Sequence, residues 1–121
     1  METFVIDGDS FSSFEEFCKV FDKVVFANCY NRWTGSLDAF NDLLRDVNCT
    51  IVWKNFAKSK MDLSYSETVK ILKERLEYCP PINRPFVRKD LQRAESGIGP
   101  TVLDWLLEII AEHDNVVLIL E

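Results

Sequence analysis

Three short apolar segments constrain the fold of this chain most strongly. They are TFVID at Thr3–Asp7, TIVW at Thr50–Trp53 and VVLIL at Val116–Leu120. Their apolar and β-branched residues are typical of β-strands, and we expect the second to be buried on both faces. Strands separated by helical segments favour parallel pairing with right-handed crossovers. We therefore expect an α/β fold with a two-layer architecture: a three-stranded parallel sheet in the order 1-2-3, with helices packed on one face.

Helical segments fill most of the chain between these strands. The S-x-x-E spacing at Ser12 and Ser64 indicates N-terminal capping boxes, and Thr101 with Asp104 resembles a third. Apolar residues follow each of these starts at the spacing of one helix face. The expected helices cover about 12–25, 36–47, 55–63, 64–78 and a last segment that begins at Thr101.

The stretch from Cys79 to Pro100 interrupts this pattern, because it contains all four prolines of the chain. Proline lacks a backbone donor and restricts the residue before it, so we expect a loop or flexible insertion at about 79–100. Positive charge is in excess between Arg84 and Arg93. We expect this segment either to lie away from a basic partner or to meet an acidic rim on it. A solvated insertion with no role is the simpler interpretation.

Length and charge limit the classes of function. A chain of 121 residues is expected to form a single domain, and its net charge of −6 favours a basic protein partner over nucleic acid. No apolar run is long enough to span a membrane, and no secretory signal is evident, so we expect a cytoplasmic protein. The four cysteines form no CxxC pattern and no cluster with histidine, which disfavours a zinc site, and without a secretory signal we expect reduced thiols. We expect no cofactor.

The segment Trp33–Val47 has the clearest functional pattern. Ser36 is suited to cap a helix in which Asp38 and Asp42 are four residues apart and share one side. Arg45 follows Asp42 by three residues and can partly pair with it. Such carboxylates are suited to a cationic pocket, although a solvated helix face is the simpler interpretation. The expected apolar face of this helix consists of Leu37, Phe40, Leu44 and Val47.

Four pieces of the sequence, in order, resemble the barstar family of intracellular inhibitors of the ribonuclease barnase. They are FVIDG, LDAFNDLL, IVWKNF and VVLIL, and the most specific element is L-D-A-x-x-D at Leu37–Asp42. The resemblance implies the parallel three-stranded fold and an acidic helix that plugs a ribonuclease active site, with carboxylates in place of substrate phosphates. By match to the motif, Asp38 and Asp42 have this role, and Glu108 provides a further acidic contact.

The chain departs from the family at contact positions. Arg32, Trp33 and Thr34 replace a tyrosine pair and a glycine, Ser36 replaces an asparagine, and Asn41 replaces an aromatic residue. The proline-rich insertion has no counterpart in short members. We therefore expect a toxin other than barnase, bound in a 1:1 complex. The partner-binding residues implied by the resemblance are Trp33, Thr34, Ser36, Leu37, Asp38, Asn41, Asp42, Arg45 and Glu108.

Other interpretations remain open. Glu108 is also an ordinary solvent-facing acid by pattern, Trp33 is also suited to packing, and His113 is expected in a loop. A small α/β enzyme is disfavoured, since the chain has one histidine, no glycine-rich phosphate loop, and carboxylates that lack a facing arrangement. A protein of barstar fold that regulates a partner other than a ribonuclease is the further alternative. We therefore expect an immunity protein, or antitoxin, that binds a basic ribonuclease toxin. We expect it to have no catalytic activity.

Overall fold

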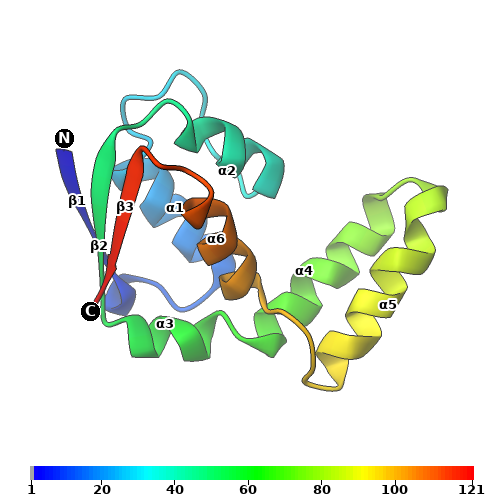
Figure 1. Cartoon of the computed structure of the whole chain (residues 1–121). Helices are drawn as coiled ribbons and strands as arrows, with labels where there is room; N and C mark the ends of the chain where they lie inside the picture. Colours follow the sequence, from blue (N-terminus) through cyan, green and yellow to red (C-terminus); the bar gives the residue numbers. More distant parts are fainter. Residues whose placement is uncertain (1) are drawn as a thin grey trace.

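The computed structural model describes residues 2–121. Strands β1 (Glu2–Asp7), β2 (Cys49–Lys54) and β3 (Val116–Leu120) form one parallel sheet in the order β1-β2-β3 (Figure 1). The mixed α/β class, the parallel pairing and the strand order expected from the sequence are confirmed.

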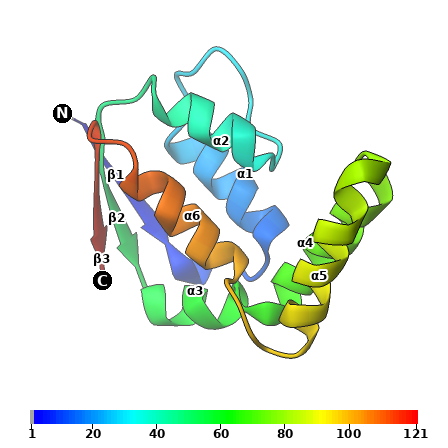
Figure 2. The ribbon, with the colours of Figure 1, turned by 45° about the vertical axis from the view of Figure 1, so that its right-hand side comes forward.

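Six α-helices lie within the described residues, and the helices that pack on the sheet lie on one side of it (Figure 2). Five of them occupy the segments expected to be helical, whereas α5 lies in the proline-rich stretch. Two short 3-10 turns, η1 (Gly8–Ser10) and η2 (Pro81–Asn83), precede α1 and α5. The helices are α1 (Phe14–Val24), α2 (Leu37–Leu44), α3 (Phe56–Asp62), α4 (Tyr65–Tyr78), α5 (Arg84–Glu95) and α6 (Val102–Ala111).

The central strand β2 is covered on one face only. Cys49, Ile51 and Trp53 point into the helix layer and are buried, whereas Thr50 and Val52 are half-buried on the opposite face. Side chains alternate between the faces of a strand, so covering a sheet on one side buries every second residue. The expectation that β2 is buried on both faces was wrong, because among the described residues no helix covers its outer face.

Aromatic side chains dominate the core between the sheet and the helices. Phe17 of α1 stacks on Trp53 of β2, with ring centroids 5.3 Å apart. The indole N–H of Trp53 donates to the hydroxyl of Ser59 at 2.9 Å, so the polar atoms of this pair are satisfied inside the core. The other fully buried large side chains include Phe11, Phe21, Phe26, Phe40, Leu44, Leu63 and Leu106.

Two helix starts differ from the expected capping boxes. Ser13, rather than Ser12, caps α1, since its hydroxyl accepts from the N–H of Glu16 at 3.2 Å. Ser64 makes no side-chain cap on α4; instead the carboxylate of Glu67 accepts from the N–H of Phe14 at 2.7 Å. Glu67 therefore satisfies a backbone donor of another helix and ties α4 to α1. The expected Thr101–Asp104 box on α6 is confirmed.

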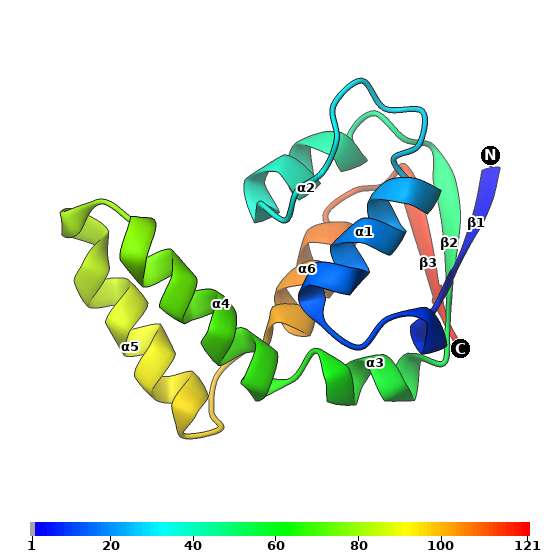
Figure 3. The ribbon, with the colours of Figure 1, turned by 180° about the vertical axis from the view of Figure 1, so that it is seen from behind.

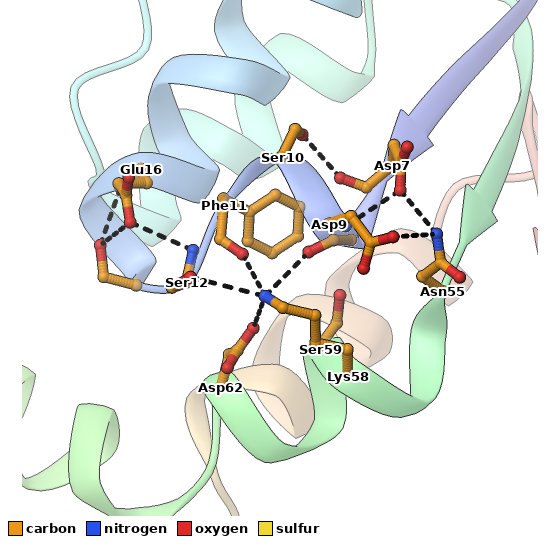
Figure 4. Close-up of polar contacts among 12 residues, drawn as sticks. Asp7, Asp9, Ser10, Phe11, Ser12, Glu16, Asn55, Lys58, Ser59 and Asp62 are labelled. Carbon is orange, nitrogen blue, oxygen red and sulfur yellow. Dashed lines mark hydrogen bonds and ion pairs between the residues drawn. The ribbon is translucent and has the colours of Figure 1, made fainter.

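A network of polar contacts closes the carboxyl end of β1 and β2 (Figure 4). The ammonium of Lys58 donates to the carbonyls of Gly8 and Phe11, at 3.2 and 2.7 Å. The amide of Asn55 donates to the carboxylate of Asp7 at 2.8 Å. A side chain on Gly8 would lie 2.6 Å from a backbone oxygen of Asn55, so this contact requires glycine. Ligands often bind at this edge of parallel sheets, but here the polar groups bond one another and join the first turn to α3.

The proline-rich stretch forms a helix rather than the expected loop. Its prolines lie at the ends of elements: Pro85 lies in the first turn of α5, where no backbone donor is needed, and Pro100 lies outside α6. Between them Val87 and Ala94 recur at helical spacing and pack against Leu72 of α4. The expectation of a loop failed because the positions of the prolines, not their number, decide whether a helix can form.

The antiparallel pair α4–α5, called the hairpin below, projects from the helix layer on the side away from the sheet (Figures 1 and 3). At its base the hydroxyl of Tyr65 donates to the carbonyl of Gly99 at 2.8 Å, and the N–H of Val102 donates to Thr68 at the same distance. These bonds fix the hairpin to α6. Within residues 2–121, no helix has the length and hydropathy needed to cross a membrane.

Candidate protein-binding surface

A glycine turn and a serine cap set the start of α2. Gly35 has φ +116°, a conformation that L side chains rarely adopt, so another residue would strain the turn. The hydroxyl of Ser36 then accepts from the N–H of Ala39 at 3.3 Å, which confirms the expected cap. This cap fixes the direction in which α2 leaves the loop. Ser36 and the preceding Thr34 are exposed.

Trp33, expected in the partner-binding set, lies in the core. It is 3% exposed, its indole N–H donates to the carbonyl of Ser36 at 2.8 Å, and its backbone N–H donates to Asp22 of α1 at the same distance. Its ring also lies 4.7 Å from that of Phe40, centroid to centroid. Trp33 therefore supports the start of α2 from inside, and the packing interpretation of this residue holds.

The outer side of α2 presents charge to solvent, and we call the exposed Asp38, Asp42 and Arg45 the acidic face. The guanidinium of Arg45 lies 3.4 Å from the carboxylate of Asp42, as expected, with both side chains about two-thirds exposed. Asp38 has no ion-pair partner within residues 2–121, but it lies in the first turn, where the helix dipole favours negative charge. The opposite side of α2 enters the core through Phe40, Leu43 and Leu44, and Leu37 is half-buried.

Two residues after α6 hold α2 in place. The amide of Asn115 donates to the carbonyls of Leu44, at 2.7 Å, and Val47. A ring nitrogen of His113 forms a 2.8 Å hydrogen bond with the side-chain oxygen of Asn41. Asn41, expected at the interface, is therefore half-buried and already engaged. Sequence reasoning missed both contacts, and the one signal was a polar pair, His113 and Asn115, next to an apolar strand.

Glu108, the remaining expected contact, is exposed on α6, which packs beside α2. No hydrogen bond or ion pair among the described residues joins it to the carboxylates of α2. From Thr101 to Glu121 the sequence has acids and no lysine or arginine. The structure thus places α6, which has acidic residues, beside α2, and it shows no direct contact between Glu108 and Asp38 or Asp42.

A groove of about 600 Å³ lies between the loop that leads into α2, the start of α1 and the first helix of the hairpin. Thr34 and Gly35 form one wall, and Lys70 and Glu74 of α4 form another. Cys18 also lines it, but burial raises the pKa of this thiol to about 12, so it stays protonated and is no nucleophile. Sequence periodicity does not predict this groove, because its walls come from three separate segments.

The described residues contain no group of three or more histidine, cysteine or acidic side chains that could hold a metal ion. All four cysteines are free thiols. No family model matches the chain, and the search of curated proteins likewise finds no match. The features that bear on function are therefore the acidic face, the residues Trp33, Ser36 and Asn115 that hold α2 in place, and the groove beside the loop before α2.

Proposed function

We propose that this chain is a barstar-like immunity protein that blocks the active site of a ribonuclease toxin with the acidic face of α2. The observation that carries the proposal is the division of α2 into two sides. One side is built into the aromatic core, and the other holds Asp38 and Asp42 in solvent on a helix with fixed ends. A rigid helix that displays two carboxylates is suited to fill a cationic cleft.

The chemistry of the target explains why carboxylates serve this purpose. A ribonuclease binds a phosphodiester and stabilises additional negative charge in its transition state, so its cleft is lined with cationic groups. An acidic surface complements that field, accelerates encounter and excludes the substrate at the same time. Asp38 and Asp42, with Glu108 nearby on α6, provide this surface, and preorganisation by Ser36 and Asn115 limits the entropy lost on binding.

The arrangement suits binding better than catalysis. Asp38 and Asp42 lie on one exposed face of one helix, whereas acid–base catalysis by two carboxylates needs them on opposite sides of a reacting bond. Cys18 lies at the groove as a protonated thiol. We therefore propose a non-catalytic, cytoplasmic protein that acts through a 1:1 complex with a basic protein and takes no cofactor.

A binding and inhibition assay tests the proposal. The probe is a purified ribonuclease toxin domain, chosen from the genes that flank this one, titrated with this protein while cleavage of a fluorescent RNA is followed. We expect inhibition that ends at one equivalent. The double variant Asp38→Asn/Asp42→Asn should lose inhibition, whereas Glu95→Gln, an exposed acid on α5, should retain it. Binding without inhibition of RNA cleavage would favour a regulatory protein for a partner other than a ribonuclease, and absence of binding would reject the proposal.

A further inference from the structure

The far end of the hairpin exposes three large apolar side chains within nine residues of sequence. The side chains are largely in solvent, with exposed fractions of 84% for Tyr78, 79% for Ile82 and 69% for Phe86. Side chains of this size and apolarity are usually buried in a core. The three residues lie at the end of α4, in η2 and in the first turn of α5. Exposed apolar groups gathered in one place mark interaction sites more often than isolated ones do. We call Tyr78–Lys89 the hairpin tip.

The hairpin tip is also cationic. It contains Arg84, Arg88 and Lys89, all exposed, and no acidic residue. Aromatic residues and arginine are enriched at the energetic centres of protein interfaces. The tip is therefore complementary to an apolar patch edged by carboxylates. The acidic face, in contrast, is complementary to a cationic cleft.

The hairpin is fixed beside the loop that leads into α2. Glu67 bonds the N-terminus of α1, and the guanidinium of Arg75 lies 5.6 Å above the ring of Trp105 on α6. The groove described above has the loop before α2 as one wall and α4 as another. The start of α2 points toward the hairpin in Figures 1 and 3. A protein that covers the acidic face and extends past the start of α2 would therefore approach the hairpin.

We propose that the hairpin tip is a second contact with the same toxin, on an apolar, acid-edged surface outside its catalytic cleft. This inference rests on the proposed function. The acidic face blocks the cleft, and Tyr78, Ile82 and Phe86 bury apolar area on the second surface. A toxin from another system that shares a cationic cleft lacks the second surface, so the tip provides specificity for one partner.

The charge of the whole chain favours a protein over a lipid surface as the occupant. The cations of the tip are few, and the remainder of the chain is strongly acidic, including α2 and α6. An anionic membrane would attract the tip and repel the rest of the molecule. A toxin with a cationic cleft and an acidic rim attracts both surfaces at once.

Point variants in the tip test this inference without disturbing the fold, since the substituted side chains are exposed. Tyr78→Ser, Ile82→Ser and Phe86→Ser are combined, and Met61→Ser on α3, where the side chain is 81% exposed, is the matched control. Association and dissociation rates are measured by surface plasmon resonance on the same toxin domain, immobilised. We expect the triple variant to dissociate about 10- to 100-fold faster, which corresponds to a loss of about 1.4–2.7 kcal/mol for the three side chains together. Met61→Ser should match the unchanged protein, and urea unfolding checks that all variants are folded.

The outcomes separate this inference from the proposed function. If Asp42→Ala loses affinity while the triple variant binds normally, the tip is not a contact, and the inhibitor role is unaffected. If the unchanged protein does not bind the toxin domain, both proposals fail. Sedimentation with phosphatidylcholine vesicles that contain phosphatidylserine is run in parallel. The inference would be overturned in favour of a membrane contact by two results together. The unchanged protein would bind these vesicles, and the triple variant would lose vesicle binding while keeping its affinity for the toxin domain.

Discussion

The acidic face and the hairpin tip differ in how each is built. The inner side of α2 is part of the main core, and its outer side presents charge almost alone. The hairpin tip instead holds large apolar side chains in solvent, at the end of two helices whose own apolar core, within residues 2–121, has three buried members, Leu72, Val87 and Ala94. We expect the charged acidic face to speed association and to orient the partner, because charges act over a distance. We expect the apolar side chains of the hairpin tip to slow dissociation.

The attachments of the two regions also differ. Helix α2 is held at its start by Trp33 and Ser36 and at its end by Asn115. The hairpin is attached at its base, while its tip makes no bond to the main core among the described residues. Regions with small cores open more readily than the rest of a protein. A change in the support of α2 should therefore cost global stability, whereas a change at the tip should not.

The largest expected effect separates a buried aromatic residue from an exposed one. Trp33→Ala should lower the free energy of unfolding by about 3–5 kcal/mol, because it leaves a cavity in the core and removes the indole hydrogen bond to the carbonyl of Ser36. Phe86→Ala should change it by less than about 0.5 kcal/mol. Urea unfolding of both variants measures the difference. Equal losses would mean that the tip is part of the folding core.

The second prediction concerns the end of α2. Asn115→Ala should cost about 1–3 kcal/mol, since it leaves the carbonyls of Leu44 and Val47 without their side-chain donor. Asn48→Ala, at an exposed position nearby, is the control and should be near neutral. Hydrogen exchange should show faster opening of α2 in the Asn115 variant and no change in α5. Uniformly faster exchange, with α5 included, would contradict the separation of the two regions.

Salt should distinguish steering from anchoring. Raising the ionic strength past about 0.15 M, where the Debye length is about 8 Å, should slow association with the toxin domain, because exposed charges on α2 and α6 lead the encounter. The dissociation rate should respond less, since apolar contacts at the tip are not screened. Stopped-flow mixing at several salt concentrations provides both rates. An association rate that ignores salt would remove the acidic face from the encounter.

The smallest expected effect is at acid pH, in the network at the end of β1. The pKa of Asp7 lies below its ordinary value of 3.8, because the N–H of Asp9 and the amide of Asn55 donate to its carboxylate. A carboxyl group whose pKa is lowered by folding stabilises the folded state at pH values above its ordinary pKa. This stabilisation is lost as the pH falls through the folded-state pKa. Asp7→Asn should therefore weaken the dependence of stability on pH below about 4. Urea midpoints from pH 5 downward check this, and parallel curves for the two proteins would contradict it.

The sequence predicted the fold better than the details of the site. Strand order followed from three apolar segments joined by helices, and Ser36 and Thr101 marked true helix starts. Glu67 could not be predicted, because its carboxylate bonds Phe14, far away in the chain. The proline content predicts a loop where α5 forms, because composition alone does not take account of the helical spacing of Val87 and Ala94. The groove and the hairpin tip depend on how separate segments pack, which periodicity alone does not contain.

The position of Trp33 shows the same limit at a single residue. A tryptophan before an acidic helix fits an interface or a core equally well by pattern. Only the packing of Phe40 and Asp22 around it decides that it is 3% exposed. Asp38 and Asp42, in contrast, are exposed as their spacing on the helix predicted. Their contact with a partner remains a prediction.

Asp42→Ala tests the central claim most directly, through two curves on one protein: affinity for the toxin domain and unfolding in urea. We predict a loss of about 2–5 kcal/mol in binding, a range drawn partly from the barnase–barstar pair, because cationic groups in the cleft would be buried without a partner. Stability should change by less than about 0.5 kcal/mol, since the exposed pair with Arg45 contributes little and removal relieves repulsion with Asp38. Unchanged affinity would contradict the account, and a large fall in stability would make Asp42 a structural residue.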